Sequence, residues 1–306
     1  MEPRQLDIFR ILAHELNFTR AAKKAHCVQS NVTVQIREIE QELGVPLFER
    51  LGKQVRLTVH GQRLLPYAER ILHLIEEAAV VAVGDQHPAG RLFIGSPESV
   101  LTYRMPPVLQ IFRANYPDVD LVFRASGTAE LIPQLEQGEL DLGLVIDDTF
   151  SDPRLYVEEL CPEPLTLLAH PAHPLATRSK LTPQDLCDQP FLLTDLGCAY
   201  RSKLEKVLAR AHVTPKAMME FTSVETIKQC ATLGMGIACL PAIVAQSEIA
   251  AGKLVALSWP GSDLTMRTLM VRHKDKWLSP AMEAFLSLLR DRLIPVETAQ
   301  PAMLSA

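Results

Sequence analysis

Short polar side chains between residues 30 and 41 could read the edges of DNA bases. Hydroxyl and amide groups exchange hydrogen bonds with those edges, and an arginine can bind guanine or a phosphate. In this stretch Val32, Ile36, Ile39 and Leu43 lie four, three and four residues apart, which places them on one stripe of a helix. The opposite side is mostly polar, with Arg37 as its charge. Such a helix can lie in the major groove, but this stretch alone also fits an ordinary amphipathic helix with a solvated outer face.

Elements on both sides of this stretch would hold it in place. The spacing predicts helices over 4–16 and 20–25, with Thr19 capping the second helix, Ser30 capping the helix that follows, and Gly44 ending it. Residues 50–58 alternate around a glycine, as a two-stranded wing does. Three basic residues near the tip of this wing could bind phosphates, although each alone also fits a solvated surface charge: Arg50, Lys53 and Arg56.

The sequence from residue 21 to residue 61 resembles the LysR-type transcriptional regulators. The matching residues are Ala-Ala at 21–22, Gln29, Gln-Ile at 35–36, Leu-Gly-Val-Pro-Leu-Phe-Glu-Arg at 43–50, Leu-Thr at 57–58 and Gly61. The resemblance extends over the whole chain, and it implies contacts with double-stranded DNA at promoter half-sites by Thr19, Arg20, Gln29, Ser30, Asn31, Thr33, Val34, Arg37, Arg50, Lys53 and Arg56.

The sequence departs from the commonest family pattern at two positions. A serine is usual where Val28 stands, and a basic residue is frequent where Val34 stands. The first departure is the reason for expecting the cap at Ser30. From the second we expect fewer phosphate contacts, or contact of Val34 with a thymine methyl group.

Residues 61–83 are predicted to form one long helix with an apolar seam. A seam of this length needs a partner, which is either its own domain or a second copy of the chain. The resemblance implies a linker helix that joins two copies into a homodimer, a homotetramer as the full assembly, and RNA polymerase as a further partner. The seam residues are Leu64, Leu65, Ala68, Ile71, Leu72, Ile75, Ala78, Ala79 and Ala82.

From residue 91 onwards predicted strands and helices alternate, and the series starts again near residue 165, which indicates a mostly parallel sheet. The pattern includes a helix over 100–115 and a strand over 165–169. The two halves resemble the two-lobed periplasmic-binding-protein architecture. We therefore expect an α/β protein with a winged helix-turn-helix over 1–60, a linker helix and hinge over 61–90, and a two-lobed effector-binding domain over 91–306. Lobe I would span about 91–160 plus 265–295, and lobe II about 161–264.

A small-molecule effector is expected in the cleft between the lobes, outside the carboxyl ends of the strands. The resemblance implies that Ser99 and Thr128 hydrogen-bond a small carboxylate or an aromatic acid. Glu98 does not suit an anion, so it either points away or indicates an effector with a positive or neutral polar group. Helix capping and turn formation are the alternative for each candidate. The candidates are Ser96, Glu98, Ser99, Thr128, Asp195, Cys198, Ser223 and Thr226.

Cys198 supports a second hypothesis, a thiol-based redox response. It lies at a predicted helix start, three residues before Arg201, and both features lower the pKa of a thiol. Peroxide-sensing members of the family have a reactive cysteine near this place, but residues 204–212 hold no resolving cysteine. A thiol that lines the cleft or has a structural role is the alternative.

The sequence offers little for catalysis or metal binding. It holds no GxSxG, P-loop or HExxH motif, and its six cysteines include no CxxC. The pair His170 and His173 has no nearby carboxylate pair. We expect no enzyme activity, no catalytic residue, no metal and no cofactor.

Composition predicts a cytoplasmic protein without a membrane partner, and the resemblance implies a bacterial protein that is nucleoid-associated when bound to DNA. There is no run of eighteen apolar residues and no secretory signal. Residues 1–60 have a net charge of +2, against −5 for the chain, so phosphate binding must come from local placement. Two other functions remain open: a two-lobed solute-binding protein or enzyme with an incidental N-terminal extension, and a DNA-binding protein of constant activity with an empty cleft.

Overall fold

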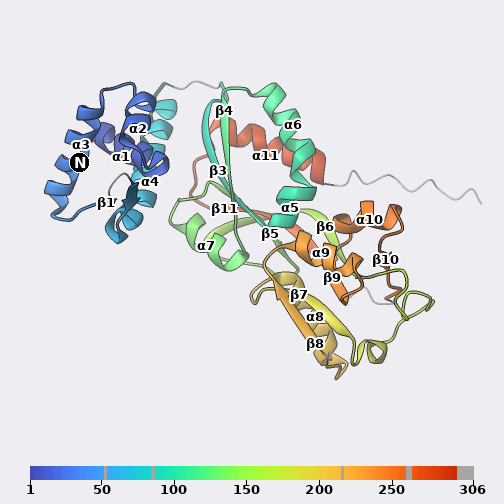
Figure 1. Ribbon diagram of the computed structural model, residues 1–306. Coiled ribbons are helices and arrows are strands. Elements are labelled where there is room, and N and C mark those ends of the chain that lie inside the picture. The colour runs from blue at the N-terminus through green and yellow to red at the C-terminus, as the bar shows by residue number, and fades with distance from the viewer. Residues whose placement is uncertain (52–53, 84–86, 215–216, 260–263, 295–306) are drawn as a thin grey trace, which may run out of the picture. The chain divides into compact units, whose positions relative to one another are not determined.

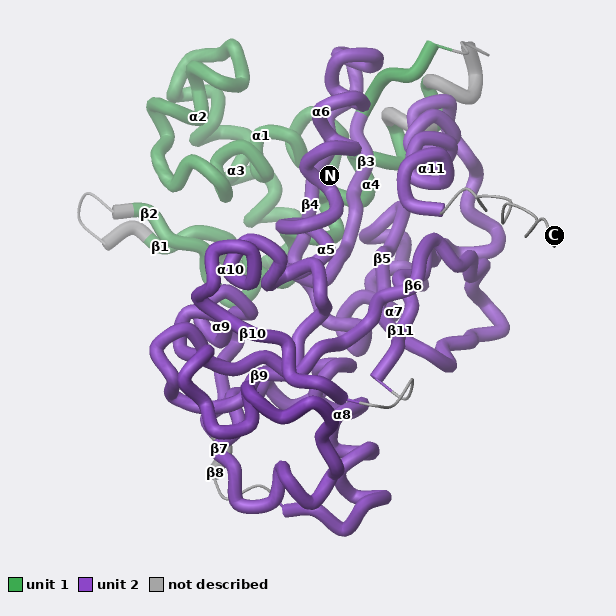
Figure 2. The backbone as a smooth tube through the Cα atoms, turned by 90° about the vertical axis from the view of Figure 1, so that its right-hand side faces the viewer, with its two compact units in different colours: residues 1–90 green, residues 91–306 purple. Residues whose placement is uncertain are grey.

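The computed structural model describes residues 1–51, 54–83, 87–214, 217–259 and 264–294 (Figure 1). The chain divides into two compact units, residues 1–90 and residues 91–306 (Figure 2). Each unit has a hydrophobic core of its own residues, as domains that fold around their own apolar side chains do.

The first unit begins with three short helices, α1 (Pro3–Glu15), α2 (Phe18–Lys24) and α3 (Gln29–Leu43). The predicted stripe of α3 is buried at Val32, Ile36 and Ile39, which join the core of the unit. Leu43, which the spacing placed in the same stripe, is 38% exposed because it lies in the last turn. Gly44 follows with a φ of 71°, the left-handed conformation that glycine adopts without strain, and it ends the helix as predicted.

Two helix caps differ from the sequence prediction. Asn17, not Thr19, caps α2, because the Asn17 side-chain oxygen accepts hydrogen bonds of 3.0 Å from the amide of Thr19 and from the next amide. Helix α3 starts at Gln29, so Ser30 lies inside its first turn and does not cap it. The N-cap is Val28, whose backbone is extended and whose carbonyl already accepts the amides of the first turn.

The predicted wing is present as an antiparallel hairpin of β1 (Phe48–Leu51) and β2 (Gln54–Leu57), in which Phe48 faces Leu57 and Glu49 faces Arg56. The Glu40 carboxylate accepts the amide of Leu47 at 2.7 Å, which fixes the start of the hairpin to α3. The rings of Phe48 and Phe9 meet with centroids 5.6 Å apart, so the hairpin is also packed on α1.

Helix α4 (Val59–Val83) begins directly against the hairpin. The Thr58 hydroxyl donates to the carbonyl of Pro46 at 2.7 Å and accepts the amide of Gly61 at 3.0 Å. A Cβ atom at Gly61 would lie 2.3 Å from the carbonyl oxygen of Leu47, so this close approach requires glycine.

The two faces of α4 differ in exposure. Leu64, Leu65, Ala68 and Leu72 of the predicted seam pack on the core of the first unit. The neighbouring face leaves an apolar stripe exposed, with Tyr67 at 62%, Ile71 at 37%, Leu74 at 50% and Ile75 at 43%. Part of the predicted seam therefore packs on its own unit, and another part, which includes Ile71 and Ile75, stays exposed.

The second unit is built on one sheet with the strand order β4-β3-β5-β11-β6-β9-β7-β8. In the first half, β3 (Gly90–Ser96) pairs parallel with β5 (Leu142–Asp147), and β4 (Val119–Ala125) forms the edge. In the second half, β7 (Pro190–Thr194) pairs parallel with β8 (Ala217–Phe221) and β9 (Ile237–Pro241). The long strands β6 (Leu155–Ala169) and β11 (Thr265–His273) run antiparallel between the halves and connect them. The predicted α/β fold, with two parallel half-sheets, is confirmed.

Helices cover both faces of each half-sheet (Figure 1). Because neighbouring strand residues face opposite sides, Ile94 joins the core under α6 (Met105–Asn115) and α11 (Pro280–Leu293), and Phe93 joins the cluster under α7 (Thr128–Glu136). In the second half, α8 (Ala199–Arg210) and α9 (Val224–Thr232) pack on β7 and β9. The remaining elements are α5 (Glu98–Tyr103), α10 (Gln246–Ala250), β10 (Val255–Ala256) and the 3-10 turns Pro183–Leu186 and Ala242–Ala245.

Two predicted elements have different bounds. The helix expected over 100–115 is divided at Arg104 into α5 and α6, because Pro106 and Pro107 lack an amide hydrogen and suit only the first turn of a new helix. The strand expected over 165–169 is the last part of β6, which starts ten residues earlier because it pairs with β11 before it pairs with β9.

Candidate functional site

The exposed side of α3 forms a mixed polar surface on the first unit. Ser30, Val34 and Arg37 are exposed, and Asn31 and Thr33 are half-buried. Among the described residues, the Arg37 guanidinium has neither an ion-pair nor a hydrogen-bond partner. It is therefore available for a group outside the chain, unlike an arginine fixed in a salt bridge.

Predicted DNA contacts on α2 lie beside this surface. The Thr19 hydroxyl donates to the side-chain oxygen of Gln29 at 3.1 Å, and the Thr33 hydroxyl donates to the Gln29 carbonyl at 3.1 Å. The first bond joins the start of α2 to the start of α3, and the second lies within α3. Arg20 is exposed but donates to the Glu15 carbonyl at 2.5 Å and pairs with the Glu15 carboxylate at 3.3 Å, which holds it toward α1.

The wing carries the remaining predicted contacts. Arg56 is exposed on β2. Arg50 belongs to β1 by its backbone, but its side chain lies outside the described part of the chain, as does the whole of Lys53. Of the three predicted wing contacts, Arg56 is therefore the one that the structure places.

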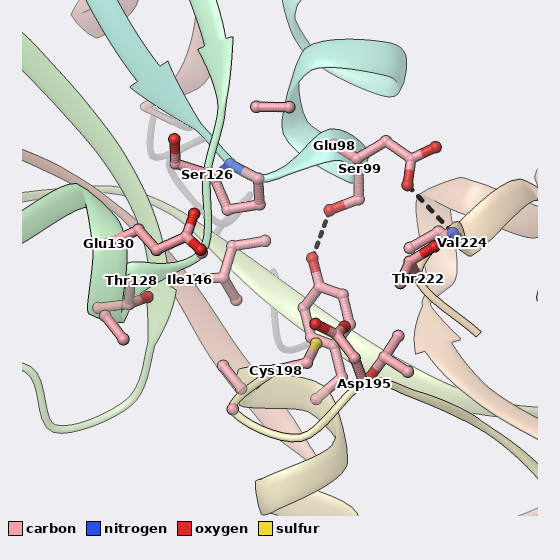
Figure 3. Close-up of a pocket in the computed structure, with 18 of the residues that line it drawn as sticks. Glu98, Ser99, Ser126, Thr128, Glu130, Ile146, Asp195, Cys198, Thr222 and Val224 are labelled. Carbon is pink, nitrogen blue, oxygen red and sulfur yellow. Dashed lines mark hydrogen bonds between the residues drawn. The ribbon is translucent and has the colours of Figure 1, made fainter. Parts of the chain in front are cut away.

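A cavity of about 370 Å³ opens in the second unit (Figure 3). Its walls are the loops that follow β3, β4, β7 and β8, together with Ile146 near the end of β5. The carboxyl ends of parallel strands are the usual place of ligand binding in open α/β sheets. Five predicted effector contacts line it: Glu98, Ser99, Thr128, Asp195 and Cys198.

The other three predicted contacts lie elsewhere. Ser96 is completely buried, and its hydroxyl donates to the Pro97 carbonyl at 3.3 Å. Ser223 caps α9 by accepting the amide of Thr226 at 3.4 Å. Thr226 itself is exposed and does not line the cavity.

Tyr200 forms part of the cavity wall and was not predicted. Its hydroxyl is hydrogen-bonded to that of Ser99 across the cavity (Figure 3). Tyr200 and Ser99 are each 3% exposed, and burial raises the pKa of Tyr200, so the phenol stays neutral. This bond joins α5 of the first half-sheet to α8 of the second.

Glu98 makes a second connection across the cavity. Its carboxylate accepts the amide of Val224 at 3.1 Å and the hydroxyl of Ser223 at 3.2 Å, both at the start of α9 (Figure 3). The N-terminus of a helix carries about half a positive charge and free amide hydrogens. The sequence left open whether Glu98 points away from the effector or indicates a positive or neutral polar one. In the structure its carboxylate lines the cavity and binds a helix end of its own chain.

Other cavity residues escaped the sequence prediction for a definable reason. Glu130, Thr194 and Thr222 also line the wall. Thr194 and Thr222 lie at or just beyond the ends of β7 and β8, so strand-end position was a usable signal for them. Glu130 lies in the first turn of α7, where an acidic side chain is common in any helix and does not by itself indicate a binding site.

The environment of Cys198 differs from the one expected. Burial raises the pKa of its thiol, against the expected decrease. The Arg201 guanidinium does not pair with the sulfur, because it binds Glu205 at 2.7 Å, Glu220 at 2.6 Å and the Thr194 carbonyl at 2.9 Å. The thiol is therefore kept in its protonated, less nucleophilic form.

A cluster outside the cavity also bridges the two halves. Lys228 of α9 lies 2.9 Å from Glu225 and 2.9 Å from Glu248 of α10, and it donates to the Tyr103 hydroxyl of α5 at 3.1 Å. Burial alone would raise the pKa of Glu225, but hydrogen bonds from Gln229, Lys228 and Tyr103 lower it to about 2. Burial alone would lower the pKa of Lys228, but its bonds to Glu248 and Glu225 raise it.

The described part of the chain holds neither a metal-binding cluster nor a membrane-spanning helix. Within the described ranges, no three His, Cys, Asp or Glu side chains lie close enough together to hold a metal ion. None of the described helices combines the length and the hydropathy needed to cross a bilayer.

Comparison with known proteins relates both units to one family. Residues 3–62 match the model of the bacterial regulatory helix-turn-helix protein, lysR family, and residues 85–294 match that of the LysR substrate binding domain. A curated relative is the uncharacterized HTH-type transcriptional regulator YwqM of Bacillus subtilis, which is 39% identical over 291 residues that cover 95% of this chain and 99% of the relative.

Two solved structures share the fold. The structure of full-length CbnR complexed with its target DNA has a TM-score of 0.70 and 22% identity, and the match covers 95% of this chain and 100% of that one. A full-length OxyR variant from Pseudomonas aeruginosa has a TM-score of 0.69 and 24% identity, with 98% and 99% covered. Together with the matches of both domains, these results show that the chain belongs to the LysR family of transcriptional regulators, with an N-terminal helix-turn-helix DNA-binding domain and a substrate-binding domain.

Proposed function

We propose that α3 enters the major groove of promoter DNA and that Arg37 contacts a guanine or a phosphate there. The observation that supports this is the combination of a buried apolar stripe with an exposed polar side whose arginine is unpaired within the described chain. Thr19 and Gln29, which bond each other beside that side, would contact the backbone or base edges next to Arg37. Arg56 and the other basic residues of the wing would bind phosphates.

Replacing Arg37 with alanine tests this proposal. Loss of a good arginine–base contact costs about 1–3 kcal/mol, or roughly fivefold to 150-fold in Kd. The measurement is a titration by gel shift on the DNA upstream of the protein's own gene, at fixed salt. Arg4→Ala is the matched control, because Arg4 is an exposed arginine of α1 on the same unit. Equal Kd values for Arg37→Ala and the wild type would refute the groove assignment.

The exposed stripe of α4 is the proposed contact between two copies of the chain. Tyr67, Ile71, Leu74 and Ile75 recur at helical spacing on a face that the first unit leaves open, and a continuous exposed stripe of this kind is typical of a helix that pairs. Two copies would place two recognition helices on two half-sites. Leu74→Asp should separate the two copies that α4 joins and so lower the mass of the assembly, measurable by sedimentation velocity; an unchanged sedimentation coefficient would reject α4 as the contact. A homotetramer and contact with RNA polymerase extend the same proposal on the basis of family membership.

The cavity of the second unit is the proposed effector site, and its occupation would change DNA binding. Two hydrogen-bonded connections, Ser99 to Tyr200 and Glu98 to the start of α9, cross it. A ligand that enters must therefore rearrange contacts between the two half-sheets, and the arrangement it favours would be passed to the DNA-binding unit. We propose a regulator rather than an enzyme, working in the bacterial cytoplasm and on the nucleoid without a cofactor. A screen for ligands that raise the melting temperature and change the gel shift tests this; a protein whose DNA binding responds to no ligand would instead be a regulator of constant activity.

A further inference from the structure

The cavity walls carry negative charge without a matching cation. Three carboxylates line the cavity, those of Glu98, Glu130 and Asp195, and the lining residues in the described part of the chain include no lysine, arginine or histidine. Glu130 and Asp195 are exposed. Neither side chain has a hydrogen-bond or ion-pair partner within the described residues, so both charges remain available to a ligand.

The two free carboxylates come from opposite walls. Glu130 projects from the first turn of α7, in the first half, and Asp195 from the loop between β7 and α8, in the second half (Figure 3). Ile146 and the ring of Tyr200 also line the space, so the wall is apolar in part. A ligand with an apolar body and a positive group would meet all three kinds of surface.

Helix ends at the cavity could in principle favour an anion, since α5, α7, α8 and α9 all begin there. Each start, however, already has a carboxylate nearby: Glu130 in α7, Asp195 just before α8, and Glu98, which lies in the first turn of α5 and binds the first amide of α9. A helix end contributes about half a positive charge, whereas each carboxylate contributes a full negative one. The cavity is therefore negative overall, and Glu98 occupies the place where an effector carboxylate would bind α9.

A metal ion does not suit this arrangement. Three carboxylates that shared one ion would have to lie within coordination distance of it, and the described residues contain no such group. Because Glu130 and Asp195 are exposed and part of the wall is apolar, an organic cation with an apolar body suits this arrangement better than a coordinated metal ion.

We propose that the effector is a small organic cation, an amine or a guanidinium compound with an apolar body, held by Glu130 and Asp195. This rests on the proposed role of the cavity as the effector site and names the chemical class that the site accepts. Glu98 is then a positioning residue, because it satisfies the start of α9 and disfavours carboxylate ligands at that point.

The test compares amines with matched acids on the full-length protein. Butylamine, benzylamine and butylguanidine are titrated against butyrate and benzoate at equal ionic strength, with binding followed by thermal shift and calorimetry. Wild type should bind at least one cation about tenfold more tightly than its matched acid. The double variant Glu130→Gln with Asp195→Asn should lose that preference. Glu283→Gln should keep it, because Glu283 lies in the first turn of α11, as Glu130 does in α7, but does not line the cavity.

A cavity-filling variant, Ala129→Trp, separates failure of the class from failure of the site, since Ala129 lines the wall and is exposed. If acids bind as tightly as amines or more tightly, and Ala129→Trp abolishes that binding, the cation assignment is overturned while the effector site stands. If Ala129→Trp abolishes the binding of none of these amines and acids, both the effector site and the cation assignment are overturned. Cation binding that survives the double variant also overturns the assignment.

Discussion

Lys228 provides the sharpest test of how the two half-sheets are held together. It is 4% exposed, and its ammonium contacts Glu225, Glu248 and the Tyr103 hydroxyl within 2.9–3.1 Å. Lys228→Met keeps most of the volume of the side chain and removes the charge. Because α5 belongs to the first half and α9 and α10 to the second, the substitution removes one connection between the halves.

The expected loss of stability follows from what the substitution leaves behind. Removing one partner of a buried ion pair costs about 3–5 kcal/mol. Glu248 is 14% exposed in its side chain and would be left without its cation, but Glu225 is 48% exposed and would be solvated. Because solvent screens the exposed Glu225, its part of this cost is small. We therefore expect the free energy of unfolding to fall by about 2–3 kcal/mol. For a unit of this size that corresponds to a decrease in Tm of roughly 5–10 °C.

The same cluster predicts a change in acid stability. The pKa of Glu225 is about 2 and that of Glu248 is also lowered, from an ordinary value of 4.5. A lowered carboxyl pKa contributes stability that is complete above the unfolded pKa and is lost as pH falls toward the folded one. Wild type should therefore lose stability as pH falls from about 5 toward 2, and the loss should be shallower in Lys228→Met because these pKa values return toward normal.

Chemical denaturation from pH 7 down to pH 3, followed by circular dichroism, measures both effects. Arg267→Met is the matched control, because Arg267 pairs with Glu159 at 3.3 Å while both side chains are about half exposed (55% and 47%). A surface pair of this kind contributes at most about 1 kcal/mol. Equal losses in the two variants, or an unchanged acid slope in Lys228→Met, would show that the buried cluster does not stabilise the second unit as argued.

Two further predictions concern single atoms. Gly61→Ala places a Cβ 2.3 Å from the Leu47 carbonyl oxygen. We expect the free energy of unfolding of the first unit to fall by about 2 kcal/mol or more and amide exchange in α4 to become faster. Gln62→Ala, on the exposed side of the same helix, should have little effect. Cys198→Ser should leave the response of DNA binding to peroxide unchanged, because burial raises the pKa of this thiol; a response present in wild type and absent from the variant would restore the redox hypothesis.

The elements of both units could be predicted from local pattern. The period of Val32, Ile36 and Ile39 places them on the buried side of α3 wherever that helix packs, and the alternation around residue 52 is sufficient for a hairpin. The loops after the strands gave Glu98, Ser99, Thr128, Asp195 and Cys198 as cavity residues, because parallel strands bring their carboxyl ends to one edge.

Contacts between distant segments could not be predicted in this way. Ser99 meets Tyr200 across 101 residues of sequence, and Glu98 reaches Val224 across 126. Cys198 resembles an activated thiol in sequence, yet burial raises its pKa and Arg201 binds other partners. Periodicity records only which side of an element is apolar, so the sequence by itself determined the elements, the family and the loops that form the site. The pairing of groups within that site, and hence its charge and its protonation, was decided by packing between the half-sheets, which depends on the whole chain at once.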